Sequence, residues 1–215
     1  MVYLCGYSVR GASAPRMIST DEVAALMTPI VLASQSPRRK ELLRRVGIPF
    51  QVFVPDVDEH CDLPAAQAVA LLSARKASAC APHFPGRFIL AADTLVSLEN
   101  RALGKPGTPE EAFRMLSALS GHTHQVMTGV SVLSPTGEAH TAVDITAVTF
   151  AAIPEAELRA YIATGEPMDK AGAYGIQGRA GLWVTHLDGC DSSVIGLPLY
   201  LVRRLLLDAG YSFPA

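Results

Sequence analysis

The feature that most constrains the fold of this chain is an alternation of short apolar runs with capped helical segments. Residues 30–33 and 88–92 are apolar runs of the buried-strand type, and a further strand is expected at 50–54. Apolar residues recur at helical spacing over 37–46 and 65–79. Strands that alternate with helices in this way are typical of an α/β protein whose sheet is covered by helices.

Two turns carry clear signals for the start of a helix. Ser36 suits the N-cap and Pro37 the first helical position of a helix that Gly47 ends. Thr108 and Glu111 have the spacing of a capping box, in which Thr108 caps a second helix and Glu111 reaches back. Both helices are therefore predicted from local chemistry as well as from periodicity.

The middle of the chain departs from the alternation. Residues 126–133 and 142–150 read as two strands joined by a Ser-Pro-Thr-Gly turn, which makes them antiparallel. The expected order continues with a helix at 154–164, a strand at 182–187 and a helix at 198–208. We therefore predict a mixed central sheet flanked by helices, in two lobes without a clean linker. Residues 1–28 are expected to be an irregular N-terminal extension, and residues 29–215 a single domain.

Composition and charge exclude some classes of protein. The chain has 215 residues, of which 49% are apolar, and its 18 basic and 20 acidic residues give a net charge of −2. That balance argues against a general nucleic-acid or polybasic membrane binder. No apolar run approaches the roughly 18 residues of a membrane span, and the opening residues lack a secretory signal. With four widely separated cysteines and no C-x-x-C pair, the chain is expected to be cytosolic, with reduced thiols.

The turn before the first helix is a candidate anion site. Arg38 and Arg39 lie in the first helical turn, where basic residues oppose the helix dipole unless an anion binds there. An ordinary basic surface helix explains them equally well, since Lys40, Arg44 and Arg45 continue the charge. The segment alone does not decide between the two interpretations.

Asp93 follows an apolar strand, at the place where open α/β sheets usually put ligand-binding groups. A carboxylate there can bind a divalent cation or accept a proton from water. For a single aspartate at a strand end, capping the next turn is the more common role.

Lysines and a glycine-rich loop are weaker candidates. Lys76, Lys105 and Lys170 are suited to phosphate oxygens, although scattered lysines are usually only solvated. In the loop 165–181, closely spaced glycines indicate unusual backbone angles or the close approach of a ligand. Gln177 offers the donor and acceptor needed to read the edge of a base, whereas a plain surface loop is the simpler interpretation.

Other patterns resemble known sites without completing them. The histidines at 122 and 124 and the run Glu59-His60-Cys61-Asp62 lack a second half at zinc-site spacing, so loop polarity explains them better. Residues 191–193 contain serines but no G-x-S-x-G elbow. Neither a P-loop nor a G-x-G-x-x-G motif occurs, which argues against an ATPase or a dehydrogenase.

Taken in order, the motifs resemble those of the Maf family of nucleoside triphosphate pyrophosphatases. The similarity covers about residues 29–208. The matching segments are Leu-Ala-Ser-Gln-Ser-Pro-Arg-Arg-Lys-Glu-Leu-Leu at 32–43, Ala-Arg-Lys-Ala at 74–77, Ala-Asp-Thr at 92–94, Leu-Gly-Lys-Pro at 103–106, Leu-Ser-Gly at 119–121 with His124, Asp-Lys-Ala-Gly-Ala-Tyr-Gly-Ile-Gln-Gly at 169–178, and Gly-Leu-Pro-Leu at 196–199.

The resemblance implies an elongated, two-lobed α/β fold, related to the inosine triphosphate pyrophosphatases, with a cleft and a possible homodimer. It implies hydrolysis of a nucleoside triphosphate to the monophosphate and diphosphate with a divalent cation, Mg²⁺ or Mn²⁺. Carried over by motif, Asp93 is the proton acceptor, and Asp93 and Glu59 are the metal ligands. The residues expected around the substrate are Ser36, Arg38, Arg39, Glu59, Lys76, Thr94, Lys105, Lys170 and Gln177.

Within the family, Asp-Thr at 93–94 with Gln177 resembles the branch that acts on dTTP and UTP, and Arg38, Thr94 and Gln177 are the specificity positions. The branch that acts on 7-methyl-GTP has Asp-Gln and a Glu at those two places. Two alternatives stay open: Asp93 as base or as metal ligand, and a methylated purine or modified pyrimidine as substrate. A regulatory nucleic-acid binder is a third, which the net charge disfavours.

Overall fold

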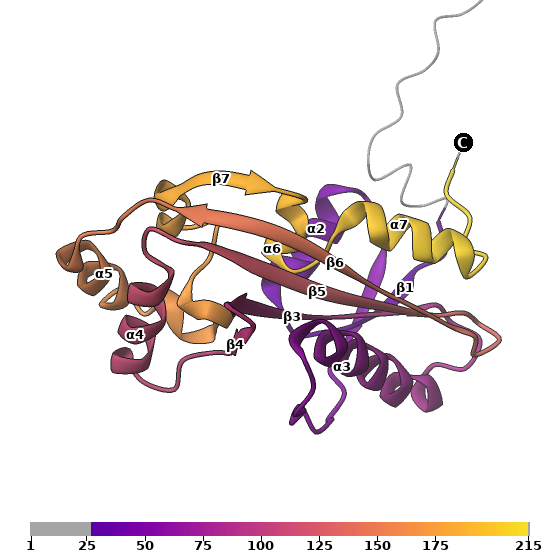
Figure 1. Cartoon of the computed structure of the whole chain (residues 1–215). Helices are drawn as coiled ribbons and strands as arrows, with labels where there is room; N and C mark the ends of the chain where they lie inside the picture. Colours follow the sequence, from indigo (N-terminus) through magenta and orange to yellow (C-terminus); the bar gives the residue numbers. More distant parts are fainter. Residues whose placement is uncertain (1–26, 215) are drawn as a thin grey trace, which may run out of the picture.

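The computed structural model describes residues 27–214, so nearly all of the predicted N-terminal extension at 1–28 lies outside the described residues. Its seven-stranded sheet has the order β2-β1-β3-β5-β6-β7, with β4 paired to β3 (Figure 1). The strands are β1 (Ile30–Ala33), β2 (Phe50–Phe53), β3 (Ile89–Leu98), β4 (Arg101–Leu103), β5 (Thr123–Leu133), β6 (Ala139–Phe150) and β7 (Val184–Asp188).

The predicted mixed sheet is confirmed. β1 runs parallel to β2 and β3, because the helix Pro37–Arg45 connects β1 to β2, the helix Ala65–Cys80 connects β2 to β3, and each returns the chain to the same end of the sheet. β3, β5, β6 and β7 are antiparallel. β1 is buried on both faces, with alternate residues in two different apolar clusters, which explains its continuous apolar run.

The molecule is elongated and two-lobed (Figure 1), with one apolar cluster on each face of the sheet in the first lobe and a third cluster in the second lobe. In one lobe, α3 covers one face of the sheet, while α2, α6 and α7 cover the other. In the other lobe, α4 and α5 pack with the loop after α5 against the far ends of β3, β5 and β6. The helices are α2 (Pro37–Arg45), α3 (Ala65–Cys80), α4 (Pro109–Leu119), α5 (Glu155–Ile162), α6 (Asp191–Ile195) and α7 (Leu199–Asp208).

Local signals located the helix ends well. Ser36 accepts a hydrogen bond from the Arg39 amide and Pro37 takes the first position, as predicted. Thr108 caps α4 through the Glu111 amide, and the Glu111 carboxylate reaches back to the amide of Gly107. None of the helices within residues 27–214 is long and apolar enough to cross a membrane.

Strand lengths and the region after α5 differ from the prediction. β3 continues to Leu98, six residues beyond the predicted end at 92, and β4 was not predicted. The predicted loop 165–181 contains two short 3₁₀ segments, at Glu166–Asp169 and Ala171–Ala173, and a third, Arg179–Trp183, begins in it and takes the first two residues of the strand predicted at 182–187. α6 was also missed, since a five-residue helix is too short to show a period.

Candidate active site

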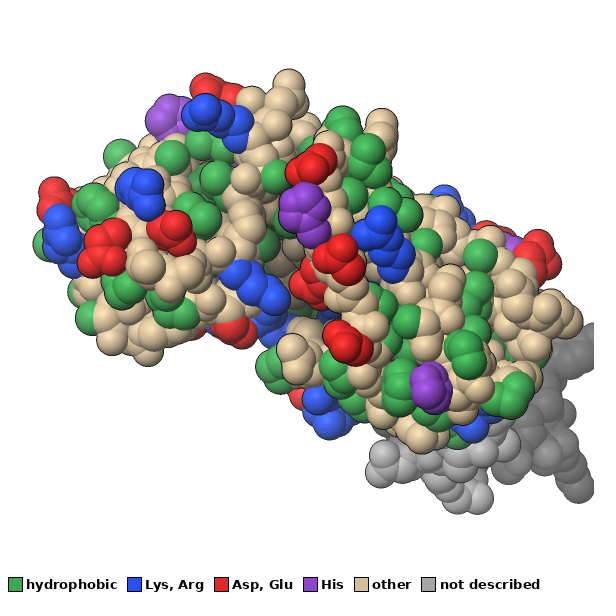
Figure 2. All heavy atoms as spheres, turned by 90° about the horizontal axis from the view of Figure 1, so that it is seen from below, with side chains coloured by type: hydrophobic (Ala, Val, Ile, Leu, Met, Phe, Trp, Pro, Cys, Tyr) green, Lys and Arg blue, Asp and Glu red, His purple; other side chains and the backbone are tan. Residues whose placement is uncertain are grey.

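A cavity of about 530 Å³ lies between the two lobes, and Figure 2 shows basic side chains along this hollow. Gln177 does not line the cavity; it is exposed on the loop just beyond Gly175, which does. The predicted residues that the fold brings together in the cavity wall are Ser36, Arg38, Arg39, Glu59, Lys76, Asp93, Thr94, Lys105 and Lys170.

Lys76 and Asp93 form the centre of the site. Lys76, on α3, places its Nζ 2.6 Å from Asp93 Oδ1 and 2.7 Å from Glu59 Oε1, and the Lys76 and Asp93 side chains are only 12% and 13% exposed. The hydrogen bond from Lys76 lowers the pKa of Glu59, aided by the charges of Lys105 and Arg39. Glu59 faces the site, whereas the neighbouring Asp58 accepts a hydrogen bond from the His60 amide.

Asp93 does not end its strand, which corrects the prediction. It sits in the middle of β3, paired opposite Gly129 of β5. The strand that ends here is its neighbour: β1 stops at Ala33, and its pairing with β3 covers only Val31 and Leu32. Pairing with β5 keeps β3 extended beyond that point. The rule that ligands bind at the carboxyl ends of parallel strands therefore holds for β1 and not for β3.

Arg39 holds a partly buried positive charge among neutral oxygens. Its guanidinium donates to the Gly196 carbonyl at 2.9 Å, Ser34 Oγ at 3.2 Å and Thr94 Oγ1 at 3.3 Å. Burial lowers the pKa of Arg39, while the negative charge of Asp93 acts in the opposite direction and raises it. No carboxylate forms an ion pair with Arg39 within residues 27–214. A partly buried guanidinium that has no acidic partner among these residues, in a cavity wall, favours the binding of an anion.

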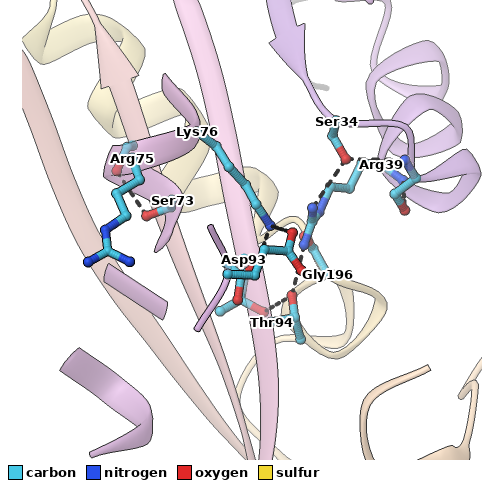
Figure 3. Close-up of polar contacts among 12 residues, drawn as sticks. Ser34, Arg39, Ser73, Arg75, Lys76, Asp93, Thr94 and Gly196 are labelled. Carbon is cyan, nitrogen blue, oxygen red and sulfur yellow. Dashed lines mark hydrogen bonds and ion pairs between the residues drawn. The ribbon is translucent and has the colours of Figure 1, made fainter. Parts of the chain in front are cut away.

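Figure 3 shows Arg39 and Lys76 approaching Asp93 and Thr94 from opposite sides, one from α2 and the other from α3. This arrangement answers the question that the α2 segment left open. At least Arg39 belongs to the cavity wall rather than to a basic surface, because its donors are bonded to the partly buried groups Ser34, Thr94 and Gly196.

The second lobe contributes a more exposed group of charges. Asp169 accepts a hydrogen bond at 3.2 Å from Arg38, which belongs to the other lobe across the cavity. Asp169 also forms an ion pair with Lys170 at 2.7 Å. Burial alone would raise the pKa of Asp169, but the hydrogen bonds and charges of Lys170 and Arg38 outweigh it and lower the pKa. Because Asp169 is exposed, a phosphate group can replace it as the partner of both cations.

The end of the glycine-rich loop is tied to α5. Tyr161 Oη accepts from the Gly175 amide at 3.2 Å and donates to Glu166 at 2.9 Å. A Cβ on Gly178 would lie 2.0 Å from the same Glu166 carboxylate, so the loop has room only for glycine there unless Glu166 moves. The Tyr161 hydroxyl thus holds the backbone at Gly175, two residues before Gln177, whose reading of a base stays a prediction.

His124 was attributed to loop polarity, and this was wrong. It lies in β5, 2% exposed, with Nε2 2.8 Å from the hydroxyl of Tyr174, which lines the cavity. Burial lowers the pKa of His124 to about 4. The strand extends beyond its predicted start because β6 pairs with it as far as Thr123.

This histidine predicts a dependence of stability on pH. His124 stays neutral in the folded protein down to about pH 4, whereas in the unfolded chain it takes up a proton below its ordinary pKa of 6.5. Its contribution, roughly 3 kcal/mol, is therefore complete above pH 6.5 and is lost as the pH falls towards 4. Urea unfolding from pH 7.5 to 4 measures it. His124→Gln should flatten the curve and His122→Gln, at an exposed histidine, should not; a curve unchanged by His124→Gln contradicts the assignment.

Sequence reasoning missed three residues of the site. Ser34 anchors Arg39 and accepts the Ser36 amide, Asp169 pairs across the cavity, and Thr128 lies behind Thr94. Ser34 and Asp169 stand within motifs already singled out, so their position was a usable signal. No sequence signal pointed to Thr128, because a threonine in a strand is unremarkable until the register of the strand pairing is known.

The two carboxylates at the centre suit a divalent cation. Glu59 and Asp93 both contact the single ammonium nitrogen of Lys76, so one cation can reach an oxygen of each. Carboxylate oxygens are the ligands that Mg²⁺ and Mn²⁺ prefer. Residues 27–214 contain no group of three or more acidic, histidine or cysteine ligands, so substrate and water oxygens would complete the shell, as is usual for Mg²⁺.

Comparisons with known proteins show which family the chain resembles. Residues 29–209 match the family described as Maf-like protein. A dTTP/UTP pyrophosphatase of Geobacillus sp. is 50% identical over 187 residues, 86% of this chain and 100% of its own length. One of Symbiobacterium thermophilum is 48% identical over 190 residues, 86% and 96% of the two chains. The solved Staphylococcus aureus Ham1 protein has a TM-score of 0.42 at 16% identity, over 58% of this chain and 72% of its own.

Proposed function

This chain belongs to the Maf family, and we propose that it hydrolyses nucleoside triphosphates to the monophosphate and diphosphate, with dTTP and UTP as substrates. The observation that carries the proposal is the meeting of Arg39 and Lys76 on either side of Asp93, in a cavity between two lobes. The names of the relatives supply the nucleotides, and the cationic wall supplies the reason why a triphosphate would bind.

The basic residues neutralise the charge of the triphosphate. Arg39 has five N–H donors, of which three are bonded to residues within 27–214, so two remain for phosphate oxygens. Lys105 and Lys170 come from the second lobe and can approach the same phosphates from the other side of the cavity. Donors fixed in place before the substrate arrives stabilise the charge of the leaving diphosphate without reorganising.

Asp93 is placed to activate the attacking water. Lys76 hydrogen-bonds only Oδ1, and no described residue donates to Oδ2, which is left to accept a proton. When bound by Asp93 and Glu59, a divalent cation would lower the pKa of water and offset phosphate charge. Lys76 holds both carboxylates in place, so either role of Asp93 depends on this lysine.

Diphosphate release from a panel of nucleotides tests the proposal. With Mg²⁺ or Mn²⁺ present, UTP and dTTP are expected to give at least tenfold higher kcat/KM than CTP or 7-methyl-GTP, and EDTA should stop the release. A preference for 7-methyl-GTP would overturn the choice of branch. Absence of release from every nucleotide would overturn the activity itself.

A further inference from the structure

We infer that Arg75 is a positioning residue that holds Glu59 in the active site. The inference rests on the proposed function, in which Glu59 and Asp93 bind the divalent cation. Arg75 stands beside Lys76 in the Ala-Arg-Lys-Ala segment, and neither its type nor its place in the sequence assigned it a role. It is exposed and does not line the cavity, so it acts through the chain that carries Glu59 and not on the substrate.

Glu59 lies on a segment with few anchors of its own. Residues 54–63 follow β2 and precede α3 without forming a helix or a strand, and none of them is buried. Within residues 27–214, no backbone group of 54–63 bonds to the backbone of another segment. A segment with so little buried surface and so few backbone bonds opens easily unless side chains hold it.

Two neighbouring residues of α3 provide the polar contacts between 54–63 and the rest of the described chain. Arg75 Nη1 donates to the carbonyl oxygens of Asp58 at 3.4 Å and of His60 at 3.3 Å. These two residues flank Glu59, and Nη1 carries two hydrogens, one for each carbonyl. Lys76 contacts the Glu59 carboxylate itself, at 2.7 Å. One residue of α3 therefore holds the backbone around Glu59, and the next holds its side chain.

The bonds from Arg75 matter most when the cation is bound. Lys76 shares one ammonium nitrogen between Glu59 and Asp93, and a cation that binds both carboxylates competes with that ammonium for them. The hold of Lys76 on Glu59 is then weakened, whereas the bonds from Arg75 to the backbone are not. Arg75 therefore keeps Glu59 beside the cation. Groups that orient a metal ligand in this way commonly contribute to the affinity for the metal.

The position and the charge of Arg75 have opposite effects on a cation. A positive charge repels the cation, so loss of the charge alone would strengthen metal binding. Loss of the two bonds to the backbone frees Glu59 and weakens metal binding. Figure 3 shows the Arg75 side chain pointing away from Asp93, whereas Lys76 points toward it, which keeps the repulsion small. The sign of the change therefore tells the two roles apart.

Arg75→Gln tests the inference, since it removes the guanidinium and keeps a polar side chain that favours a helix. The Mg²⁺ concentration that gives half the maximal rate on UTP should rise about three- to tenfold, with kcat at saturating Mg²⁺ changed by less than about twofold. Hydrogen exchange, measured without metal or nucleotide, should become at least about threefold faster in 54–63. Arg75→Lys keeps the charge without the planar fork and should fall between the parent and Arg75→Gln in both measurements.

Arg87→Gln is the matched control, because Arg87 also donates to a backbone carbonyl, that of Pro29 at 2.8 Å, and lies outside the cavity wall. It removes the same charge and should leave both the Mg²⁺ requirement and the exchange in 54–63 unchanged. Unchanged exchange in Arg75→Gln, or a Mg²⁺ requirement that stays the same or falls, overturns the inference. Exchange needs no turnover, so it still tests the role of Arg75 if no nucleotide is hydrolysed, which separates this inference from the proposed activity.

Discussion

Replacing Asp93 by asparagine is expected to lower kcat on UTP and dTTP by about 10²–10⁴-fold or more, leaving no useful turnover. The amide can neither accept a proton from water nor serve as an anionic ligand of a divalent cation. Lys76 would keep one carboxylate partner, since Glu59 lies 2.7 Å from its Nζ, so the charge is not left unpaired. The variant should therefore remain folded.

Steady-state diphosphate release measures the effect, and circular dichroism with thermal unfolding checks the fold. Asp188→Asn is the matched control, because Asp188 ends β7, is exposed and lies outside the cavity. It should keep parental kcat. An Asp93→Asn variant that turns over within tenfold of the parent would falsify the assignment of Asp93.

Gly129→Ala is expected to lower the free energy of unfolding by about 3 kcal/mol or more. A Cβ at Gly129 would lie 2.2 Å from the carbonyl oxygen of Val69 and 2.4 Å from its carbon, atoms of the α3 backbone. The helix would have to move away from the sheet, because neither backbone can rotate aside as a side chain does. Glycine in a strand commonly marks such a close approach.

The same substitution should also disturb the active site. Gly129 pairs directly opposite Asp93, and Lys76 follows Val69 by two turns on α3. Moving α3 outwards therefore lengthens the 2.6 Å contact between Lys76 and Asp93 and should lower kcat as well as stability. Urea unfolding and kcat measured together test this. Gly104→Ala, with no atom within 4 Å of its Cβ, is the stability control; a Gly129→Ala protein as stable as the parent would contradict the account.

Much of the fold follows from local signals. The β1 run, the Ser36 cap with Pro37 and the Thr108 cap each depend on a few neighbouring residues, and all were predicted. The ends of the strands could not be predicted as well. β3 extends past Asp93 and β5 includes His124 only because a partner strand continues beside them, and no residue within either segment encodes that.

The candidate site likewise has a part that local motifs predicted and a part that they did not. Short motifs selected Arg39, Lys76 and Asp93, since local composition and spacing mark a cationic helix start, a lysine on a helix and a carboxylate after an apolar run. They did not reveal that Lys76 bridges Glu59 and Asp93, nor that Thr128 stands behind Thr94.

The sequence by itself determined the order of the longer strands and helices, two helix caps and the resemblance to one family, because each is written in residues close together in the chain. Only the tertiary structure decided the contacts that define the chemistry. Arg39 meets Thr94 across 55 residues and Gly196 across 157, and these distances are set by strand register and helix packing. Such contacts depend on how whole elements pack against one another, which no local pattern specifies.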